Sequence, residues 1–315
     1  MRLMLANPRG FCAGVDRAVK IVELAIAEFG PPVYVRKEIV HNSHVVRALR
    51  GKGAVFVSEL DEVPAGALTI FSAHGVGPEV FRQASERGLR VIDATCPLVT
   101  KVHAEVRRFV KAGYHIVLIG HEGHDEVVGT RGHAPGSITL IENEDQARTR
   151  SLPPHDKLVV LTQTTLGVED TAGVVAALRE RFPYLELPPT EDICYATQNR
   201  QDTVKAMAER GMDLLLVVGS NNSSNAARLL EVGQSRGVRG RLIDGAEHIE
   251  AAWLAGVTRV GVTAGASTPE HVVQQVVGRL RELGVGSVDV CTTVEEDTVF
   301  QLPPILRQAR SAAER

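Results

Sequence analysis

The first residues, MRLMLANPRGFCAGVDRAVKIVELAIAEFGPP (1–32), decide the fold class of the chain. A short apolar run at 3–6 is followed by the turn residues Asn7-Pro8-Arg9-Gly10, and apolar side chains then recur at helical spacing from Val15 to Phe29. The run is typical of a buried strand and the periodic stretch of an amphipathic helix, which Gly30-Pro31-Pro32 ends. This strand–turn–helix order is the repeating unit of α/β folds with mostly parallel sheets.

The same order continues along the chain. The expected strands lie at 68–72, 89–92, 116–119, 158–161, 214–218 and 260–263. The expected helices lie at 79–87, 99–112, 171–182, 203–210, 226–235, 249–255 and 269–283. The stretch after Gly284 loses clear periodicity. We therefore expect an α/β protein.

Length and composition limit the classes of protein and partner. At about 150 residues per domain, 315 residues predict two domains, and three small ones also fit. With 35 Lys and Arg against 38 Asp and Glu, no global positive field exists to hold a nucleic acid. No apolar run approaches the roughly 20 residues that span a bilayer, and the N-terminus does not resemble a secretory signal. We expect a cytoplasmic protein with no nucleic-acid or membrane partner.

Three of the four cysteines occupy equivalent places in this pattern, roughly a third of the chain apart. Cys12 follows the first strand, Cys96 follows the run at 91–95, Cys194 follows Asp192-Ile193, and each precedes a helix. Because ligands of open α/β sheets bind beyond the carboxyl ends of the strands, three lobes about one centre would bring these thiols together. Cys291 lacks this placement and is interpreted as a plain thiol.

The cysteine pattern favours an iron–sulfur site. Four cysteines in a chain of this length are no disulfide framework, and C-x-x-C pairs typical of structural zinc are absent. Three inert buried thiols remain the alternative, but three at matching junctions make coincidence less plausible. Iron–sulfur clusters normally take four cysteines, so three would leave one iron open to an outside ligand, as a Lewis acid.

The loops after the apolar runs are rich in neutral donors and histidines. Ser223-Ser224-Asn225 precedes a helix, which fits both an ordinary N-cap and an anion-binding helix terminus. The segment 121–126 is not an H-E-x-x-H zinc motif, because His121 and His124 are three apart and Gly123 opposes a continuous helix. Such a loop better positions a histidine and a carboxylate for proton transfer, with Glu126 favoured although spacing leaves Asp125 and Glu122 open.

Neither a P-loop nor a G-x-G-x-x-G dinucleotide motif after the first strand occurs in the sequence. Electrons, if they are used, must therefore come from a partner protein or a small donor.

Taken together, the motifs closely resemble the 4-hydroxy-3-methylbut-2-enyl diphosphate reductases, the LytB/IspH family of isoprenoid synthesis. The matching segments are Ala6-Asn7-Pro8-Arg9-Gly10-Phe11-Cys12-Ala13-Gly14-Val15, Val40-His41-Asn42, Ser72-Ala73-His74-Gly75-Val76, Asp93-Ala94-Thr95-Cys96-Pro97-Leu98-Val99, Gly123-His124 with Glu126, Gln163-Thr164-Thr165-Leu166, Ile193-Cys194-Tyr195-Ala196-Thr197, Asn222-Ser223-Ser224-Asn225 and Thr263-Ala264-Gly265-Ala266-Ser267. They follow one another in order from 6 to 267, so the resemblance covers nearly the whole chain.

The resemblance implies three small α/β domains with mostly parallel sheets, in pseudo-threefold arrangement around a central iron–sulfur site. The implied domains are 14–96, with residues 1–13 supplying the first cysteine loop, then 97–190 and 191–283, followed by a C-terminal tail at 284–315.

The resemblance also implies the site residues. Cys12, Cys96 and Cys194 would ligate one 4Fe–4S cluster whose fourth iron stays open to the substrate hydroxyl. Glu126 would deliver the proton, with Thr164 and His124 beside it. The substrate-binding residues would be His41, His74, His124, Thr164, Ser223, Ser224, Asn225 and Ser267.

The implied reaction is a two-electron reductive dehydroxylation. It would convert 4-hydroxy-3-methylbut-2-enyl diphosphate into isopentenyl and dimethylallyl diphosphate, the last step of the methylerythritol phosphate route. The electron donor would be a protein such as a flavodoxin or ferredoxin.

Two other hypotheses compete with the reductase. A zinc hydrolase would use the cysteines with His121 or His124, although the ligand spacings are wrong for it. A metal-free binding module would hold a phosphorylated small molecule at the helix start of Ser223-Ser224-Asn225.

Overall fold

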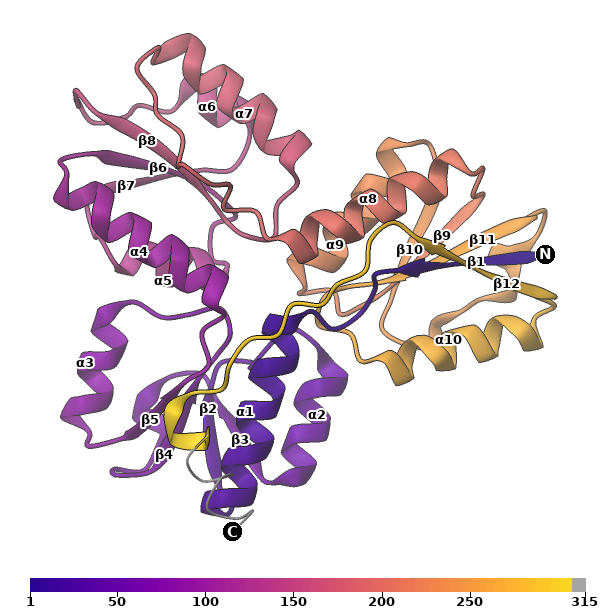
Figure 1. The fold of residues 1–315 in the computed structure, drawn as a ribbon, viewed down its shortest axis with the longest axis horizontal. Coiled ribbons are helices and arrows are strands. Elements are labelled where there is room, and N and C mark those ends of the chain that lie inside the picture. The colour runs from indigo at the N-terminus through magenta and orange to yellow at the C-terminus, as the bar shows by residue number, and fades with distance from the viewer. Residues whose placement is uncertain (308–315) are drawn as a thin grey trace. The chain divides into compact units, whose positions relative to one another are not determined.

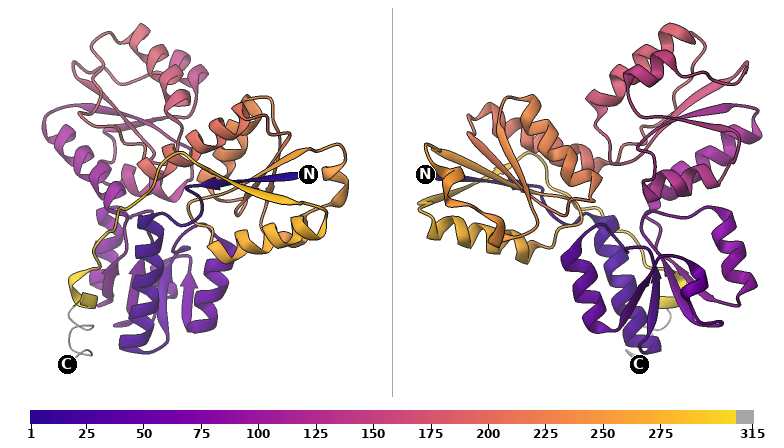
Figure 2. Two further views of the ribbon diagram at one scale, coloured as in Figure 1. Left: turned by 45° about the vertical axis from the view of Figure 1, so that its right-hand side comes forward. Right: turned by 180° about the vertical axis from the view of Figure 1, so that it is seen from behind.

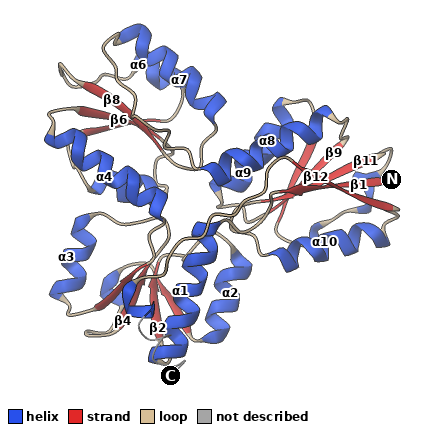
Figure 3. Ribbon diagram, viewed as in Figure 1, coloured by secondary structure: helices blue, strands red, loops and turns tan. Residues whose placement is uncertain are grey.

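The computed structural model describes residues 1–307, which form three sheets whose strands are all parallel (Figure 3). The expected α/β class with mostly parallel sheets is confirmed. The chain forms two compact units. The first unit comprises Met1–Asp16, Val40–Ala48 and Tyr195–Phe300, and the second comprises Arg17–Ile39, Leu49–Cys194 and the described residues from Gln301.

The first unit contains one sheet of five strands, in the order β10-β9-β11-β1-β12. Its strands are β1 (Arg2–Asn7), β9 (Leu214–Val218), β10 (Arg239–Ile243), β11 (Arg259–Ala264) and β12 (Ser287–Thr292). The first and last strands of the chain therefore lie side by side (Figure 1). The aperiodic stretch after Gly284 forms β12 because its backbone pairs with β1, from Arg2 opposite Ser287 to Asn7 opposite Thr292, and not because of an apolar pattern of its own.

Helices cover both faces of this sheet (Figure 1). One face packs on α10 (Glu270–Glu282) through Leu3 and Leu5 of β1, and the other packs on α8 (Tyr195–Glu209) and α9 (Ser224–Ser235) through Met4 and Ala6. Successive strand residues point to opposite faces, so a strand covered on both sides is apolar throughout. Cys291 is buried in the core beneath α8 and α9.

The prediction of an α-helix at 249–255 is wrong. This region contains the short 3-10 segments η2 (Ala246–His248) and η3 (Ala251–Leu254) instead. So short a stretch gains few hydrogen bonds for the entropy that α-helix nucleation requires.

The second unit contains two sheets. One has the order β3-β2-β4-β5, with β2 (Val33–Arg36), β3 (Ala54–Val57), β4 (Leu68–Phe71) and β5 (Arg90–Asp93). Its neighbouring chain segments form α1 (Ala13–Phe29), α2 (Ser43–Lys52), η1 (Leu60–Glu62) and α3 (Pro78–Glu86). The division between the two units falls within both α1 and α2.

The other sheet of the second unit has the order β7-β6-β8, with β6 (His115–Ile119), β7 (Ile138–Ile141) and β8 (Leu158–Thr162). One face packs on α4 (Pro97–Lys111) and α5 (Asp125–Gly132), and the other on α6 (Glu144–Thr149) and α7 (Val168–Arg181), as both views of Figure 2 show.

The domain bounds inferred from the resemblance stay a prediction, as does the pseudo-threefold arrangement. The sheet order adds that β1 and β12, from 1–13 and 284–315, complete the sheet formed by strands of 191–283. Residues 308–315 of the expected tail lie outside the described residues.

A buried histidine makes the stability of the second unit depend on pH. His103 of α4 stacks on His133 at 4.1 Å between ring centroids and is 5% exposed. Burial, together with the nearby His133 and Arg107, lowers the pKa of His103 to about 3. In the unfolded chain His103 is protonated as the pH falls below about 6.5, whereas in the folded chain it stays neutral down to about pH 3. The free energy of unfolding is therefore full above about pH 6.5 and decreases as the pH falls toward 3.

We expect the free energy of unfolding in urea to fall between pH 7 and pH 5, with about 2 kcal/mol of the fall due to His103. The variant His103→Gln cannot titrate and should show a shallower fall by that amount. Equal slopes for both proteins would show that His103 is not the group responsible.

Candidate functional site

The three cysteines share one local geometry, immediately before the first residue of a helix. Cys12 precedes α1, Cys96 is the N-cap of α4, and Cys194 precedes α8. None of the four cysteines, all within the described residues, is in a disulfide, and these three are partly exposed. A helix N-terminus presents N–H groups without intrahelical partners and the positive end of the helix dipole, which suits an anionic ligand.

The expected strand-to-helix junctions are found at Cys12 and Cys96, which follow β1 and β5. Cys194 differs, because an irregular segment precedes it and α8 begins at Tyr195, eight residues before the start of the helix expected at 203–210.

In the first unit, the loop that carries Cys12 meets the loop after β11. The Cys12 N–H donates to the carbonyl of Ala266 at 3.2 Å, and the Ala266 N–H donates to Asn225 Oδ1 at 2.8 Å. The next residue, Ser267, donates its hydroxyl to the carbonyl of His41 at 2.8 Å. The first unit thus brings four predicted site residues together at the carboxyl end of its sheet.

Ser223 and Ser224 stand at the start of α9. Ser223 is the N-cap, and its hydroxyl accepts the Ala226 N–H at 3.3 Å, while Ser224 is the first residue of the helix. The local capping role is therefore present. The use of this helix terminus for an anion stays a prediction.

Two polar groups that the sequence analysis did not single out, the buried Arg200 and the partly buried Asp244, hold these loops. Arg200 is fully buried, donates to the carbonyl of Gly10 at 2.9 Å and pairs with Glu296 at 3.0 Å. It thereby anchors the loop that carries Cys12. This loop lines a cavity of about 350 Å³ together with Arg200 and Glu296. In the sequence, Arg200 looks like one more polar position of a helix, so no local pattern reveals it.

Asp244 likewise anchors the segment that carries His41. Its carboxylate accepts hydroxyl hydrogen bonds from Ser43 at 2.7 Å and Ser220 at 2.8 Å. Partial burial raises the pKa of Asp244, but these hydrogen bonds and the nearby His44 and His248 outweigh it, so the pKa lies below its ordinary value. The ionised carboxylate therefore ties residues 43–44 to the ends of β9 and β10.

In the second unit, two hydrogen bonds join Glu126 and Thr164. The Thr164 N–H donates to Glu126 Oε1 at 2.7 Å and its hydroxyl donates to Oε2 at 3.0 Å. Both residues are buried, at 3% and 5% exposure. The carboxyl group of Glu126 is thus held in one orientation by a neighbour that is itself a proton donor and acceptor.

His124 and His74 lie beside this pair. His124 is the N-cap of α5, and its Nδ1 accepts the N–H of Glu126 at 3.2 Å, so a neutral His124 carries its proton on Nε2. The ring of His74 meets that of His124 edge-to-face at 5.9 Å, and its Nδ1 lies 3.3 Å from the Ser72 hydroxyl. The expectation that Gly123 opposes a continuous helix across 121–126 is confirmed, because α5 begins only at Asp125.

Backbone hydrogen bonds connect both cysteines of the second unit to these residues. The Cys96 N–H donates to the carbonyl of Ala73, next to His74, at 2.9 Å, and the Cys194 N–H donates to the carbonyl of Thr164 at 3.0 Å. Arg17 adds a positive charge near Cys96. Burial lowers the pKa of its guanidinium, and the electrostatic interactions with Cys96 and Asp93 oppose that shift.

Helix α5 reaches the His74 loop through a close backbone contact. A Cβ at Gly129 would lie 2.7 Å from the carbonyl oxygen of Gly75, and Gly75 itself has a φ of +78°. Only glycine permits this approach at 129, so the residue sets the distance between the loop of His74 and the helix of Glu126.

We expect Gly129→Ala to destabilise the protein by about 1–3 kcal/mol, because the methyl group must push two backbone segments apart. Urea unfolding measures the loss. Gly278→Ala in α10 is the matched control, since nothing lies within 4 Å of its added Cβ and it should stabilise by about 1 kcal/mol. Unchanged stability of Gly129→Ala would contradict the close contact.

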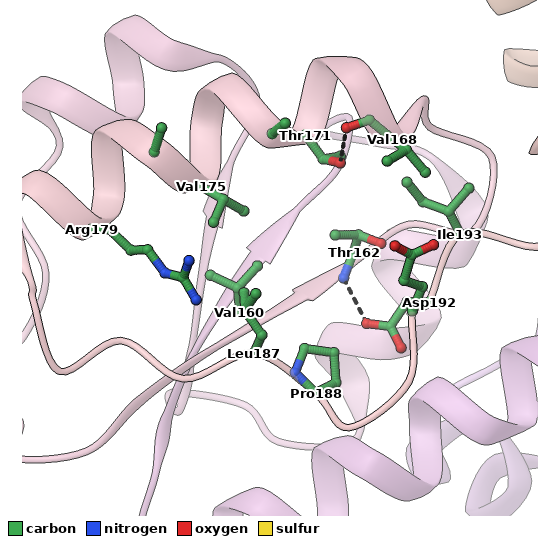
Figure 4. A pocket seen from close by; sticks show the side chains of 13 residues that line it. Val160, Thr162, Val168, Thr171, Val175, Arg179, Leu187, Pro188, Asp192 and Ile193 are labelled. Atoms are coloured by element: carbon green, nitrogen blue, oxygen red, sulfur yellow. Dashed lines mark hydrogen bonds between the residues drawn. The ribbon is translucent and has the colours of Figure 1, made fainter.

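A separate pocket of about 450 Å³ lies beside α7 and contains none of the predicted site residues (Figure 4). Its lining is mostly apolar, with Arg179, Glu191 and Asp192 as the charged members. Burial and the neighbouring carboxyl group of Glu105 raise the pKa of Asp192 to about 7.

Within residues 1–307, no helix combines the length and apolar character needed to cross a membrane.

Comparisons with a family model, with curated proteins and with solved structures all match this chain to one family. A family model described as "LytB protein" matches residues 3–281. The chain is 57% identical over 310 residues to "4-hydroxy-3-methylbut-2-enyl diphosphate reductase 1" of Mycobacterium bovis, covering 98% of this chain and 92% of the relative. A reductase of the same name from Tropheryma whipplei is 56% identical, covering 98% and 99% of the two chains.

Among solved structures, the E-1-hydroxy-2-methyl-but-2-enyl-4-diphosphate reductase from Plasmodium falciparum matches with a TM-score of 0.95 at 38% identity. That match covers 100% of this chain and 99% of the other. A second structure, of an (E)-4-hydroxy-3-methyl-but-2-enyl diphosphate reductase, matches with a TM-score of 0.63 at 34% identity, covering 90% of this chain.

Proposed function

We propose that this chain, which belongs to the LytB family, is a 4-hydroxy-3-methylbut-2-enyl diphosphate reductase of the methylerythritol phosphate route to isoprenoids. The observation that carries the proposal is the 57% identity, over 98% of the chain, to a curated reductase of that name. In the reaction the allylic C–O bond breaks, two electrons and two protons are taken up, and water leaves. Protonation at either end of the allyl fragment gives isopentenyl or dimethylallyl diphosphate.

Cys12, Cys96 and Cys194 are the proposed ligands of one 4Fe–4S cluster with an open fourth iron. The donor set suits such a group, because all three are partly exposed thiols at helix N-termini and Arg17 lies near one of them. When bound, the cluster supplies electrons and a Lewis-acid site for the substrate hydroxyl. Cys291 is buried in the core of the first unit and is not a ligand in this proposal.

Replacing each of Cys12, Cys96 and Cys194 with serine should abolish or strongly reduce the iron and acid-labile sulfide held after anaerobic reconstitution. Cys291→Ser is the control and should keep both. Wild-type protein that stays colourless after reconstitution would count against the reductase, and zinc without acid-labile sulfide would favour the zinc hydrolase. Tight binding of a phosphorylated ligand by Cys96→Ser would favour the metal-free binding module.

Glu126 is the proposed proton donor, with Thr164 as its relay. When Glu126 is protonated on Oε2, the 3.0 Å hydrogen bond that Thr164 donates in the structure reverses, so that Oε2–H donates to Thr164 Oγ while the Thr164 hydroxyl gives its own proton to the leaving oxygen. The Thr164 N–H keeps Oε1 in place throughout at 2.7 Å. Protonation matters because hydroxide is a poor leaving group and water is a good one.

The diphosphate would bind to neutral donors and histidines. The proposed residues are His41, His74, His124, Ser223, Ser224, Asn225 and Ser267. Binding energy from this end of the substrate, far from the bond that breaks, holds the hydroxyl in place for reaction. A proton on His124 Nε2 can serve as a donor to the substrate, because its Nδ1 is occupied by the N–H of Glu126.

The remaining parts of the proposal concern the partner and the compartment. We infer a small electron-donor protein such as a flavodoxin or ferredoxin, because the sequence carries neither common nucleotide-binding motif. We further infer a cytoplasmic location.

Glu126→Gln should lower kcat by about 100- to 10,000-fold and change KM little, because the amide keeps the shape but has no acidic proton. Steady-state kinetics with a chemical reductant measures both constants. Glu122→Gln, exposed on the same loop, is the matched control and should behave like the wild type. Near-normal turnover of Glu126→Gln would refute the proton assignment.

A further inference from the structure

The positions of Cys96 and Cys194 depend on two different elements of the second unit. Cys96 caps α4, and its carbonyl accepts the Thr100 N–H at 2.9 Å, so this cysteine moves with the helix. Cys194 ends an irregular stretch, residues 187–194, that we call the Cys194 segment. A cluster that uses both thiols requires a fixed distance between helix and segment.

Apolar packing holds the Cys194 segment only in part. The pocket of about 450 Å³ separates it from α7, with Leu187, Pro188 and Ile193 on the pocket wall (Figure 4). Leu187 is 43% exposed. Ile193 packs against the core, but the cavity leaves the segment with fewer dispersion contacts than full packing would give, so polar contacts must help to fix its place.

Those polar contacts come from Lys101 and Asp192. Lys101 lies one turn into α4, and its Nζ donates to the main-chain carbonyls of Thr190 at 3.2 Å and Glu191 at 2.7 Å. It also lies 3.3 Å from Asp192 Oδ1. The other oxygen of Asp192, whose side chain is fully buried, accepts the N–H of Thr162 at the end of β8, at 3.0 Å.

We propose that Lys101 is a positioning residue that, with Asp192, fixes the Cys194 segment to α4 and so sets the separation of the Cys96 and Cys194 thiols. This inference rests on the proposed function, because the separation matters only if both thiols hold one cluster. Lys101 donates to main-chain carbonyls of the segment itself, so its contacts constrain the backbone, unlike an exposed ion pair between two mobile side chains.

The first experiment needs no cluster. Hydrogen–deuterium exchange of the full-length apo-protein reports the N–H of Thr162, bonded to Asp192, and that of Cys194, bonded to Thr164. In Lys101→Met, which keeps the length of the side chain but removes its N–H donors, exchange of the peptides containing these amides should rise about tenfold. Exchange in α10, in the first unit, should be unchanged.

The second experiment follows the cluster. Anaerobically reconstituted protein is mixed with an iron chelator, and the cluster absorbance should decay about tenfold faster in Lys101→Met than in the wild type. Lys205→Met is the matched control, because Lys205 also lies 3.3 Å from an aspartate but pairs with Asp202 within its own helix. It should release the cluster at the wild-type rate. Asp192→Asn, which removes the charge and keeps the size, serves if Lys101→Met does not fold.

The outcomes separate this inference from the proposed function. Faster exchange together with faster release supports the positioning role. Unchanged exchange, or faster exchange with an unchanged rate of release, overturns it while leaving the reductase proposal intact. A wild-type chain that takes up no cluster overturns both proposals.

Discussion

In parallel sheets, the carboxyl ends of the strands and the N-termini of the following helices lie on one side, and the candidate site depends on this constraint. Helix N-termini present N–H groups without intrahelical partners, which favour thiolates and anions. Cys12, Cys96 and Ser223 all stand at such positions. A chain with a net charge of only −3 can therefore offer local anion sites without clusters of lysine or arginine.

The sequence predicted those strands and helices whose apolar pattern is long enough to be read alone, such as β6, β9 and α10. It missed β2, β3, β7, β10 and β12, and it missed α2, α5 and α6. β10 and β12 are half-exposed, so pairing with a neighbour and not their own hydrophobicity makes them strands. α5 has a nearly unpatterned sequence, but its glycines let it lie against the loop of His74.

The predicted site residues lie in short sequence motifs, so the residues beside them in the sequence are enough to identify them as site residues. The residues that hold those motifs could not be found in the same way. Arg17, Lys101 and Arg200 lie on helices, where charged side chains ordinarily face solvent. Their partners are carbonyls at distant positions of the sequence: Arg200 bonds to Gly10 and Lys101 to Glu191. Only the folded chain brings such groups together.

Buried charges are expensive unless they are paired, so their use here requires a reason. Arg200 binds a main-chain carbonyl of the Cys12 loop beside the 350 Å³ cavity, and Asp192 ties the Cys194 segment to the end of β8 beside the 450 Å³ pocket. Apolar side chains of similar size could stabilise the protein equally well, but they could not fix a loop by direction. Hydrogen bonds can, because their strength falls steeply with angle. These polar ties therefore place the cysteine loops more than they stabilise the fold.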